Sequence, residues 1–305
     1  MTGRFAPSPT SAMHLGNLRT ALLSWVFARR EGEGFLVRIE DLDQQRVTAA
    51  HGVADQQLTD LAAIGLEWDE PVVRQSDRLG LYRDAITSLD TYECYCTRRE
   101  VAEASQAPHD GHRPYPGTCA NLSDSERAQR RTQRPAALRV RSEGASFAIH
   151  DRYAGEVTGL VDDFVVARGD GTPAYNLAVV VDDGLQGVSQ VVRGDDLLSS
   201  APRQAWLADR LGFPVPEYMH VGLAVNAEGQ RLAKRDGAVS LADLAELGHS
   251  AVEVRGWLLA SLDLEPGLTN AELLQLPLEA WAAAARRWVV DPDQLAGLVN
   301  RMSTT

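Results

Sequence analysis

The stretch RFAPSPTSAMHLGN at residues 4–17 decides how this chain folds, because it joins a strand to a helix through a proline-rich turn. We predict a short strand at Gly3–Ala6, which Pro7 and Pro9 end, since proline lacks a backbone N–H and restrains the residue before it. The apolar residues after the turn share one face of a predicted helix: Leu15, Leu18, Leu22, Trp25 and Val26. Strand, turn and helix in this order are typical of an α/β fold.

The turn brings polar residues to the start of the predicted helix. Free N–H groups and the positive end of the helix dipole favour a polyphosphate at such a position. His14 can donate a hydrogen bond to phosphate oxygens, and Gly16 would let a nucleotide ring lie close to the backbone. Taken alone, His14 is also compatible with an ordinary polar turn.

A second indication of a nucleotide site is Lys234, the single lysine among 30 Lys and Arg residues. An ammonium is a compact point charge on a flexible stem, whereas guanidinium is a planar fork, so lysine suits a phosphate whose geometry changes during reaction. The alternative is a chance remainder of an arginine-rich composition. A lone lysine would fall inside one given five-residue motif with odds of roughly 2%, a prior from composition. We therefore interpret Lys234 as a phosphate ligand.

Helix and strand patterns alternate along the chain, which predicts a Rossmann-like, doubly wound parallel sheet with ligands at the carboxyl ends of its strands. The predicted strands after the first are Phe35–Ile39, Leu177–Val181 and Ser189–Val192. The predicted helices are Val53–Ile64, Tyr82–Leu89, Val252–Leu262, Leu278–Arg287 and Pro292–Met302. The predicted regions are 1–90 and 136–240 as the two halves of a catalytic domain, 91–135 as an insertion, and 241–305 as a helical C-terminal region.

Composition limits the class of protein. The hydrophobic content of 44% and charged content of 24% are typical of a soluble globular protein. We find no signal peptide pattern and no apolar run long enough for a membrane span, so we expect a cytoplasmic location. The net charge of −12 argues against a general nucleic-acid binder. A tRNA partner is compatible with this charge if arginines gather on one face. One local group could be such a patch or a solvated helix face, and it consists of Arg127, Arg130, Arg131 and Arg134.

Five motifs together resemble the class I aminoacyl-tRNA synthetases of the glutamyl type. RFAPSPTSAMHLGN is similar to their HIGH region, and RLAKR at 231–235 is similar to their KMSKS loop. The segments VRIEDLD at 37–43, PAYNLAVVVDD at 173–183 and VVRGDDLL at 191–198 occur in the same order as in that family. Three positions depart from the family pattern, with Ser11 in place of Gly, Arg231 in place of Lys and Ala233 in place of Ser.

The charges at the predicted strand ends suit glutamate, which carries two carboxylates and one ammonium. Arginine binds carboxylates bidentately, so Arg4 and Arg193 could hold them, and Glu40 could take the ammonium. The resemblance implies a glutamate site formed by Arg4, Phe5, Ala6, Pro7, Ser8, Glu40, Tyr175 and Arg193. It also implies an ATP site, with Mg²⁺ accompanying the ATP, formed by Thr10, His14, Gly16, Asn17 and Lys234. His14 and Lys234 are the expected catalytic residues.

Three cysteines lie within one short segment, as Cys94, Cys96 and Cys119. Without a secretory signal disulfides are not expected, and three thiolates with one further ligand would form a closed structural zinc site. The alternative is three free thiols. His109 and His112 are natural fourth ligands chemically, whereas the resemblance implies Tyr115, which we select ahead of His112.

The length after the KMSKS-like loop refines the resemblance. An anticodon-reading region needs on the order of 200 residues, more than residues 237–305 provide, so we expect none. A catalytic half with a three-cysteine insertion resembles the glutamyl-Q tRNA(Asp) synthetases. This implies activation of L-glutamate by ATP without tRNA, then transfer to queuosine in the anticodon of tRNA(Asp), by a monomeric enzyme. The alternatives are a shortened glutamyl-tRNA synthetase that charges a tRNA 3′ end and a non-catalytic adenylate- or tRNA-binding paralogue.

Overall fold

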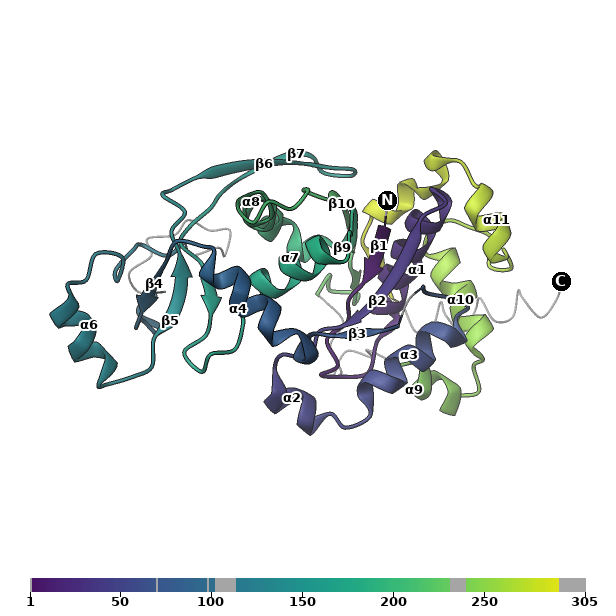
Figure 1. The fold of residues 1–305 in the computed structure, drawn as a ribbon. Coiled ribbons are helices and arrows are strands. Elements are labelled where there is room, and N and C mark those ends of the chain that lie inside the picture. Colours follow the sequence, from purple (N-terminus) through teal and green to yellow (C-terminus); the bar gives the residue numbers. More distant parts are fainter. Residues whose placement is uncertain (1, 70, 98, 102–113, 231–239, 291–305) are drawn as a thin grey trace.

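The computed structural model describes residues 2–69, 71–97, 99–101, 114–230 and 240–290 (Figure 1). Within these ranges the main element is a seven-stranded sheet with the order β3-β2-β1-β9-β10-β6-β7. Its strands are β1 (Thr2–Phe5), β2 (Gly34–Ile39), β3 (Val73–Arg74), β6 (Ser146–Asp151), β7 (Gly155–Leu160), β9 (Gln190–Gly194) and β10 (Glu217–Val221). Neighbours from β3 to β6 pair in parallel, which confirms the predicted parallel sheet for these strands.

The prediction of an all-parallel sheet is wrong at its edge, where β7 pairs antiparallel with β6. Only Arg152, Tyr153 and Ala154 separate the two strands. A connection this short can form a hairpin, whereas a parallel pair needs a crossover of a dozen residues or more. The sheet is therefore mixed, with a parallel centre.

Helices cover both faces of the parallel centre, as expected for a doubly wound sheet. Successive residues of β9 point to opposite faces: Val192 packs with α1 (Leu15–Arg30) and α10 (Ala251–Ala260), and Val191 packs with α8 (Ala201–Arg210). Figure 1 shows α8 and α7 (Tyr175–Leu185) on one side of β9 and α1 on the other. Burial of both faces explains why β2 shows no alternation of apolar and polar residues at Phe35, Leu36 and Val37.

Most of the predicted helices are confirmed. The apolar face predicted after the first turn is buried in α1, and the predicted helices around residues 53–64 and 82–89 are α3 (Val53–Ala63) and α4 (Leu79–Thr87). At the C-terminal side, α10 matches its prediction, and the segment predicted at Leu278–Arg287 is a 3-10 helix, η4 (Leu278–Ala285). The helix predicted at Pro292–Met302 lies outside the described residues.

The strand predicted at Leu177–Val181 is wrong, because these residues belong to α7. All of them are buried, so no polar residue interrupts the run to mark a helical period. A short continuous apolar run fits a buried strand and a buried helix equally well by periodicity. The two acids that end the run, Asp182 and Asp183, lie in the last turns of this helix and are buried.

A second, smaller sheet forms from β4 (Thr91–Cys94), β5 (Ala137–Val140) and β8 (Val165–Ala167), all antiparallel. Together with α6 (Asp124–Arg131) it lies at the end of the molecule far from α10 and α11 (Asn270–Gln275), as Figure 1 shows. The sheet joins strands from both sides of residue 135. The division of the chain into four regions stays a prediction.

Short elements complete the described structure. They are α2 (Gln44–Ala49), η1 (Gln75–Arg78), η2 (Asp195–Ser200), β11 (Ala224–Val225), α9 (Leu241–Glu246) and β12 (Trp288–Val289). None of the helices in the described ranges combines the length and the apolar character that crossing a membrane requires.

Candidate active site

A cavity of about 440 Å³ opens where β1, β2 and β9 end. It lies at the carboxyl edge of the parallel strands, where ligands bind in such sheets. Most of the predicted glutamate- and ATP-site residues line it: Phe5, Ala6, Pro7, Ser8, Thr10, His14, Gly16, Asn17, Glu40, Tyr175 and Arg193. Arg4 is not among the residues that line the cavity. Lys234 lies outside the described residues.

The turn after β1 is held in place by two neighbouring elements. The buried side chain of Gln57, in α3, donates hydrogen bonds to the carbonyl oxygens of Ser8 (3.1 Å) and Ser11 (2.9 Å). The backbone N–H of Glu40 donates to the carbonyl oxygen of Pro7 at 2.9 Å. The turn therefore keeps a fixed position although its prolines supply no N–H donors.

His14 caps the helix that follows the turn. Its Nδ1 accepts a hydrogen bond from the Gly16 N–H at 3.1 Å, and the Asn17 side chain accepts one from the His14 N–H at 3.1 Å. Because Nδ1 is an acceptor, the neutral ring carries its proton on Nε2. The expectation of free amides at this terminus is not met for Gly16, Asn17 and Leu18, which all donate within the turn. The imidazole N–H and the helix dipole are thus the better candidates for phosphate contacts.

Gly16 is required by close packing. A Cβ atom at this position would lie 2.9 Å from Cβ of Ala224 in β11 and 2.9 Å from Cε1 of His14. Side-chain atoms essentially never approach this closely, so alanine would displace either the His14 ring or β11. The residue predicted to admit a nucleotide therefore also keeps the imidazole in its capping position.

Behind the cavity lies a buried network of alternating charges. Asp183 accepts two hydrogen bonds from Arg4, both at 3.3 Å, and it pairs with Arg38 at 2.8 Å. Arg38 also contacts Glu40, with 3.3 Å between Nη2 and Oε1. Asp183 thus compensates both guanidinium groups, whose charges would otherwise be costly to bury. This network places the Glu40 carboxylate at the cavity wall.

Asp182, which precedes Asp183 in α7, belongs to the same network. Its carboxylate is fully buried and accepts hydrogen bonds from Arg78 (2.7 Å), Gln75 (2.9 Å) and Tyr82 (2.8 Å). Arg38 lies 3.5 Å away. A buried carboxylate with this many donors is satisfied, so α7 is held firmly against η1 and α4.

Glu40 is one of two acidic residues that line the cavity, and the other is Asp196. Burial raises the pKa of its carboxyl above the ordinary value, and the nearby positive charges of Arg38 and Arg4 offset only part of that rise. A raised pKa means that the neighbouring positive charges do not fully offset the cost of burying the ionised carboxylate. A cation placed in the cavity would supply what is missing. Glu40 is therefore suited to bind an ammonium group.

Arg193 and Tyr175 bring the opposite character to the wall. Arg193 lies in β9 and is 5% exposed, and its guanidinium contacts His220, Gln204 and the carbonyl oxygen of Leu197. Tyr175 is the first residue of α7 and is 43% exposed. The cavity is therefore lined by a guanidinium, a phenol and the carboxylates of Glu40 and Asp196, which can recognise a ligand that carries both charges.

A second cavity of about 620 Å³ shares Ser8, Glu40 and Tyr175 with the first. Beyond these shared residues its lining includes Asp43 and Arg168. Tyr175 thus stands between two cavities at the same strand edge. This arrangement leaves space for a second ligand next to one bound at Glu40.

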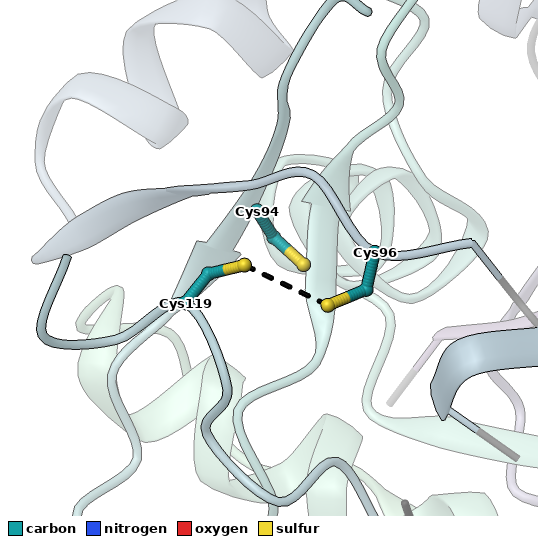
Figure 2. A group of neighbouring side chains, drawn as sticks. All are labelled: Cys94, Cys96 and Cys119. Carbon is teal, nitrogen blue, oxygen red and sulfur yellow. Dashed lines mark hydrogen bonds between the residues drawn. The ribbon is translucent and has the colours of Figure 1, made fainter. Parts of the chain in front are cut away.

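The three cysteines gather beside the small sheet, as Figure 2 shows. Their sulfur atoms all lie within 4.8 Å of one another, and those of Cys96 and Cys119 are 3.6 Å apart. Two thiolates on one tetrahedral zinc would be about 3.8 Å apart, given a Zn–S bond of about 2.3 Å. The Tyr115 oxygen accepts a hydrogen bond from the Cys94 thiol at 3.4 Å and lies 3.7 Å from the Cys96 sulfur. The four predicted ligands therefore lie together, and this donor set fits zinc.

The neighbourhood of the cysteines favours a negative charge at one sulfur. Burial raises the pKa of Cys96 to about 11. Burial also raises the pKa of Cys119, but hydrogen bonds outweigh it and the net shift is downward. Arg130 donates to the Cys119 sulfur at 3.5 Å. The histidines considered as other ligands, His109 and His112, lie outside the described residues.

The arginine group near α6 makes contacts within the protein. Arg131 binds the Glu93 carboxylate through two nitrogens, and Arg127 pairs with Asp124 at 2.9 Å. Arg134 donates to the carbonyl oxygen of Tyr95 at 2.9 Å. These contacts favour a local structural role over a basic patch for tRNA.

Several residues that build the site could not be given a role from the sequence. Arg38 and Asp183 occur in motifs that the sequence analysis recognised, and a charged residue inside an apolar strand or helix is the signal that could have identified them. Gln57 and His220 gave no such signal. Their contacts depend on elements distant in sequence, which only the fold brings together.

A parallel α/β sheet with a helix-capping histidine and a charged cavity at its carboxyl edge is the arrangement of a class I synthetase. The family model for "tRNA synthetases class I (E and Q), catalytic domain" matches residues 1–257. A crystal structure of a glutamate tRNA ligase from Elizabethkingia meningosepticum, in complex with its amino acid, resembles this fold with a TM-score of 0.80. The two proteins are 22% identical, and the match covers 100% of this chain and 70% of the ligase. At this identity the likeness shows the fold alone.

Relatives in sequence are more specific. A glutamyl-Q tRNA(Asp) synthetase of Nocardia farcinica is 57% identical over 289 residues, which are 92% of this chain and 92% of the relative. One of Cutibacterium acnes is also 57% identical, over 98% of this chain and 86% of the relative. The chain therefore belongs to the class I tRNA synthetases, and within them to the glutamyl-Q tRNA(Asp) synthetase family of ligases.

Proposed function

We propose that this enzyme activates L-glutamate with ATP, without tRNA, and transfers the glutamyl group to queuosine in the anticodon of tRNA(Asp). The names of the relatives from Nocardia farcinica and Cutibacterium acnes support this proposal. The observation that carries it is the cavity at the strand ends, which both Glu40 and Arg193 line. A zwitterion with an additional carboxylate matches these charges.

In the proposed complex Glu40 receives the glutamate ammonium and Arg193 binds a carboxylate through its planar guanidinium. The Tyr175 hydroxyl and the backbone of Phe5–Ser8 complete the glutamate site. Arg4 is hydrogen-bonded to Asp183, so it would not grip the ligand itself. It would contribute positive charge, which already acts to lower the pKa of Glu40. A binding role for Arg4 would therefore be chiefly electrostatic.

The proposed ATP site follows the turn and the start of α1. The His14 Nε2–H would donate to the triphosphate, beside Thr10, Gly16 and Asn17 on the cavity wall. Lys234 would follow the β- and γ-phosphates, and Mg²⁺ bound to ATP would neutralise part of their charge. Positioning and electrostatic stabilisation would supply most of the rate enhancement.

The activation step forms one bond and breaks another at the α-phosphorus. An oxygen of the glutamate α-carboxylate attacks the α-phosphate, and pyrophosphate leaves with the bonding electrons. The product is glutamyl-adenylate. The cationic groups near the turn would stabilise the charge that moves onto the leaving pyrophosphate.

The second step would use the cavity on the other side of Tyr175. A hydroxyl of the queuosine cyclopentenediol attacks the acyl carbon, AMP leaves, and the hydroxyl proton passes to a phosphate oxygen of the adenylate. The second cavity adjoins the proposed glutamate site at Ser8 and Glu40, so an acceptor there would lie next to the acyl group. Anticodon loops, whose bases can turn outward, are usual targets for proteins that recognise RNA.

We also propose a structural zinc ion held by Cys94, Cys96, Tyr115 and Cys119. When bound, zinc would supply a cross-link between β4 and the segment around Tyr115. Among its described residues, this part of the chain has a small apolar cluster of its own, in which the cysteines take part. A metal ion commonly supplies stability where a core is small.

The test of the activation step is ATP–pyrophosphate exchange with purified enzyme, L-glutamate and no tRNA. The proposal expects exchange that depends on glutamate and is absent with glutamine or aspartate. Exchange only after addition of tRNA would contradict the proposed tRNA independence. Absence of exchange under both conditions would favour a non-catalytic paralogue, and charging of unmodified tRNA(Glu) would favour a shortened glutamyl-tRNA synthetase.

A further inference from the structure

A histidine behind the cavity connects Arg193 to a buried acid. His220 lies in β10, beside Arg193 in the neighbouring strand β9. The Arg193 Nε–H donates to Nε2 of His220 at 2.9 Å, and Nδ1 of His220 lies 2.7 Å from Oδ2 of Asp151. Asp151 ends β6, the next strand of the sheet. The three side chains are buried, so this line of contacts is shielded from water.

The direction of each hydrogen bond follows from chemistry. A guanidinium nitrogen can only donate, so Nε2 of His220 must be the acceptor. The neutral ring then carries its proton on Nδ1 and donates it to Asp151. The Asp151 carboxylate also accepts from the backbone N–H groups of Tyr153 (3.0 Å), Ala154 (2.8 Å) and His220 (2.9 Å). Three backbone donors on one carboxyl group favour the ionised acid, which can accept a further hydrogen bond from the His220 ring.

A second arm fixes the other side of the guanidinium. Nη1 of Arg193 donates to the Gln204 oxygen at 2.5 Å, and the Gln204 amide donates to Asn176 at 2.9 Å. Nη2 of Arg193 donates to the carbonyl oxygen of Leu197 at 3.3 Å. A guanidinium has five N–H donors, and these contacts with the described residues use three of them. Two donors, both on terminal nitrogens, are thus left for a ligand in the cavity.

We propose that Asp151 and His220 are positioning residues that hold the Arg193 guanidinium in the orientation in which it binds a glutamate carboxylate. The inference rests on the proposed function, because it takes glutamate as the ligand of Arg193. Asp151 sets the tautomer of His220, and His220 in turn fixes the Nε edge of the guanidinium. The terminal nitrogens then face the cavity in a single rotamer, ready for a bidentate contact.

Burial supports the neutral state that this role needs. The surroundings lower the pKa of His220, chiefly through burial, and the positive charge of Arg193 acts in the same direction. A protonated ring would place an N–H against the Arg193 Nε–H. The neutral acceptor is therefore the form that can hold the guanidinium.

The test compares two variants that each keep one end of the imidazole. In His220→Asn the amide can still donate to Asp151, but nothing reaches Arg193. In His220→Gln the longer side chain returns an acceptor near the Nε2 position. The KM for glutamate, the KM for ATP and kcat are measured by ATP–pyrophosphate exchange, with His150→Asn on the exposed part of β6 as the matched control.

We expect His220→Asn to raise the KM for glutamate by about tenfold or more, as loss of an oriented charged contact would. The KM for ATP should stay unchanged, and His220→Gln should recover much of the loss. An unchanged KM for glutamate in His220→Asn, or an equal rise in both KM values, would overturn the inference. Wild-type enzyme without glutamate-dependent exchange would instead overturn the proposed function.

A measurement on the wild-type protein keeps the inference testable if His220→Asn does not fold. Nitrogen-15 NMR distinguishes the two neutral tautomers of each of the 7 histidines, and the signal that is lost in His220→Gln assigns His220. We expect the proton on Nδ1. A proton on Nε2, or a charged ring at neutral pH, would contradict the proposed orientation of Arg193.

Discussion

Replacing Glu40 with glutamine should weaken glutamate binding without harming the fold. The side chain keeps its size, and the amide oxygen can still accept from Arg38, which lies 3.3 Å from the Glu40 carboxylate. What is lost is the negative charge that would receive the substrate ammonium. A hydrogen bond to a charged group contributes about 1.5–3 kcal/mol. Since about 1.4 kcal/mol corresponds to tenfold in affinity, the KM for glutamate should rise by about ten- to 150-fold.

The same change should preserve or increase stability at neutral pH. Burial raises the pKa of Glu40, so the native protein holds this proton more tightly than the unfolded chain does. Ionisation therefore costs stability as the pH rises above the ordinary glutamate pKa of about 4.3, and the cost is complete above the raised native pKa. Glutamine never ionises. The variant should match the wild type at pH values of about 4 and below, and should be at least as stable at pH 7.

The assay combines ATP–pyrophosphate exchange at varied glutamate concentration with thermal unfolding across this pH range. Glu31→Gln, at the exposed C-terminal end of α1, is the matched control and should change neither quantity. A normal KM for glutamate in Glu40→Gln would refute the assigned role of Glu40. A melting temperature well below that of the wild type at pH 7 would refute the argument from burial.

Three further predictions concern other parts of the molecule. If zinc is bound, purified protein should contain about one zinc per chain, and Cys119→Ser should lower both the zinc content by metal analysis and the melting temperature; metal-free protein of equal stability would favour free thiols. Lys234→Arg should retain glutamate binding by calorimetry but lose about 10²–10³-fold in kcat, the usual effect of removing one transition-state contact, and near-normal turnover would exclude that role. Asp182→Asn should lower the free energy of unfolding, measured by urea denaturation, by about 3–5 kcal/mol, because it leaves buried cations uncompensated. Tyr82→Phe removes one hydrogen-bond donor to Asp182 and should lower it by about 1.5–3 kcal/mol. A larger loss in Tyr82→Phe than in Asp182→Asn would contradict the described network.

The elements that depend on short-range sequence signals could be predicted. The turn at residues 4–17, the helix after it and the strand before Glu40 could be recognised because proline, apolar spacing and charge change sharply there. The run at Leu177–Val181 was assigned to the wrong element, since its periodicity is hidden when every side chain is buried. The antiparallel direction of β7 was not predicted either. The short hairpin connection to β6 determines that direction.

The candidate site was predicted to a similar degree and with the same limits. Residues at strand ends, such as Glu40 and Arg193, could be placed at one edge from topology alone. Sequence could not show that Arg4 pairs with Asp183, or that His220 meets Arg193, because these pairs join elements far apart in the chain. Such contacts depend on sheet order and register, which the fold as a whole determines.

Transfer of glutamate to queuosine can be measured with labelled substrate. Labelled glutamate, ATP and enzyme are supplied with tRNA(Asp) from cells that make queuosine and with tRNA(Asp) from cells that cannot make it. We expect label on the first tRNA only, and label that survives removal of the 3′-terminal nucleotides. Equal labelling of both tRNAs, or loss of the label with the 3′ end, would show conventional charging and contradict the proposed function.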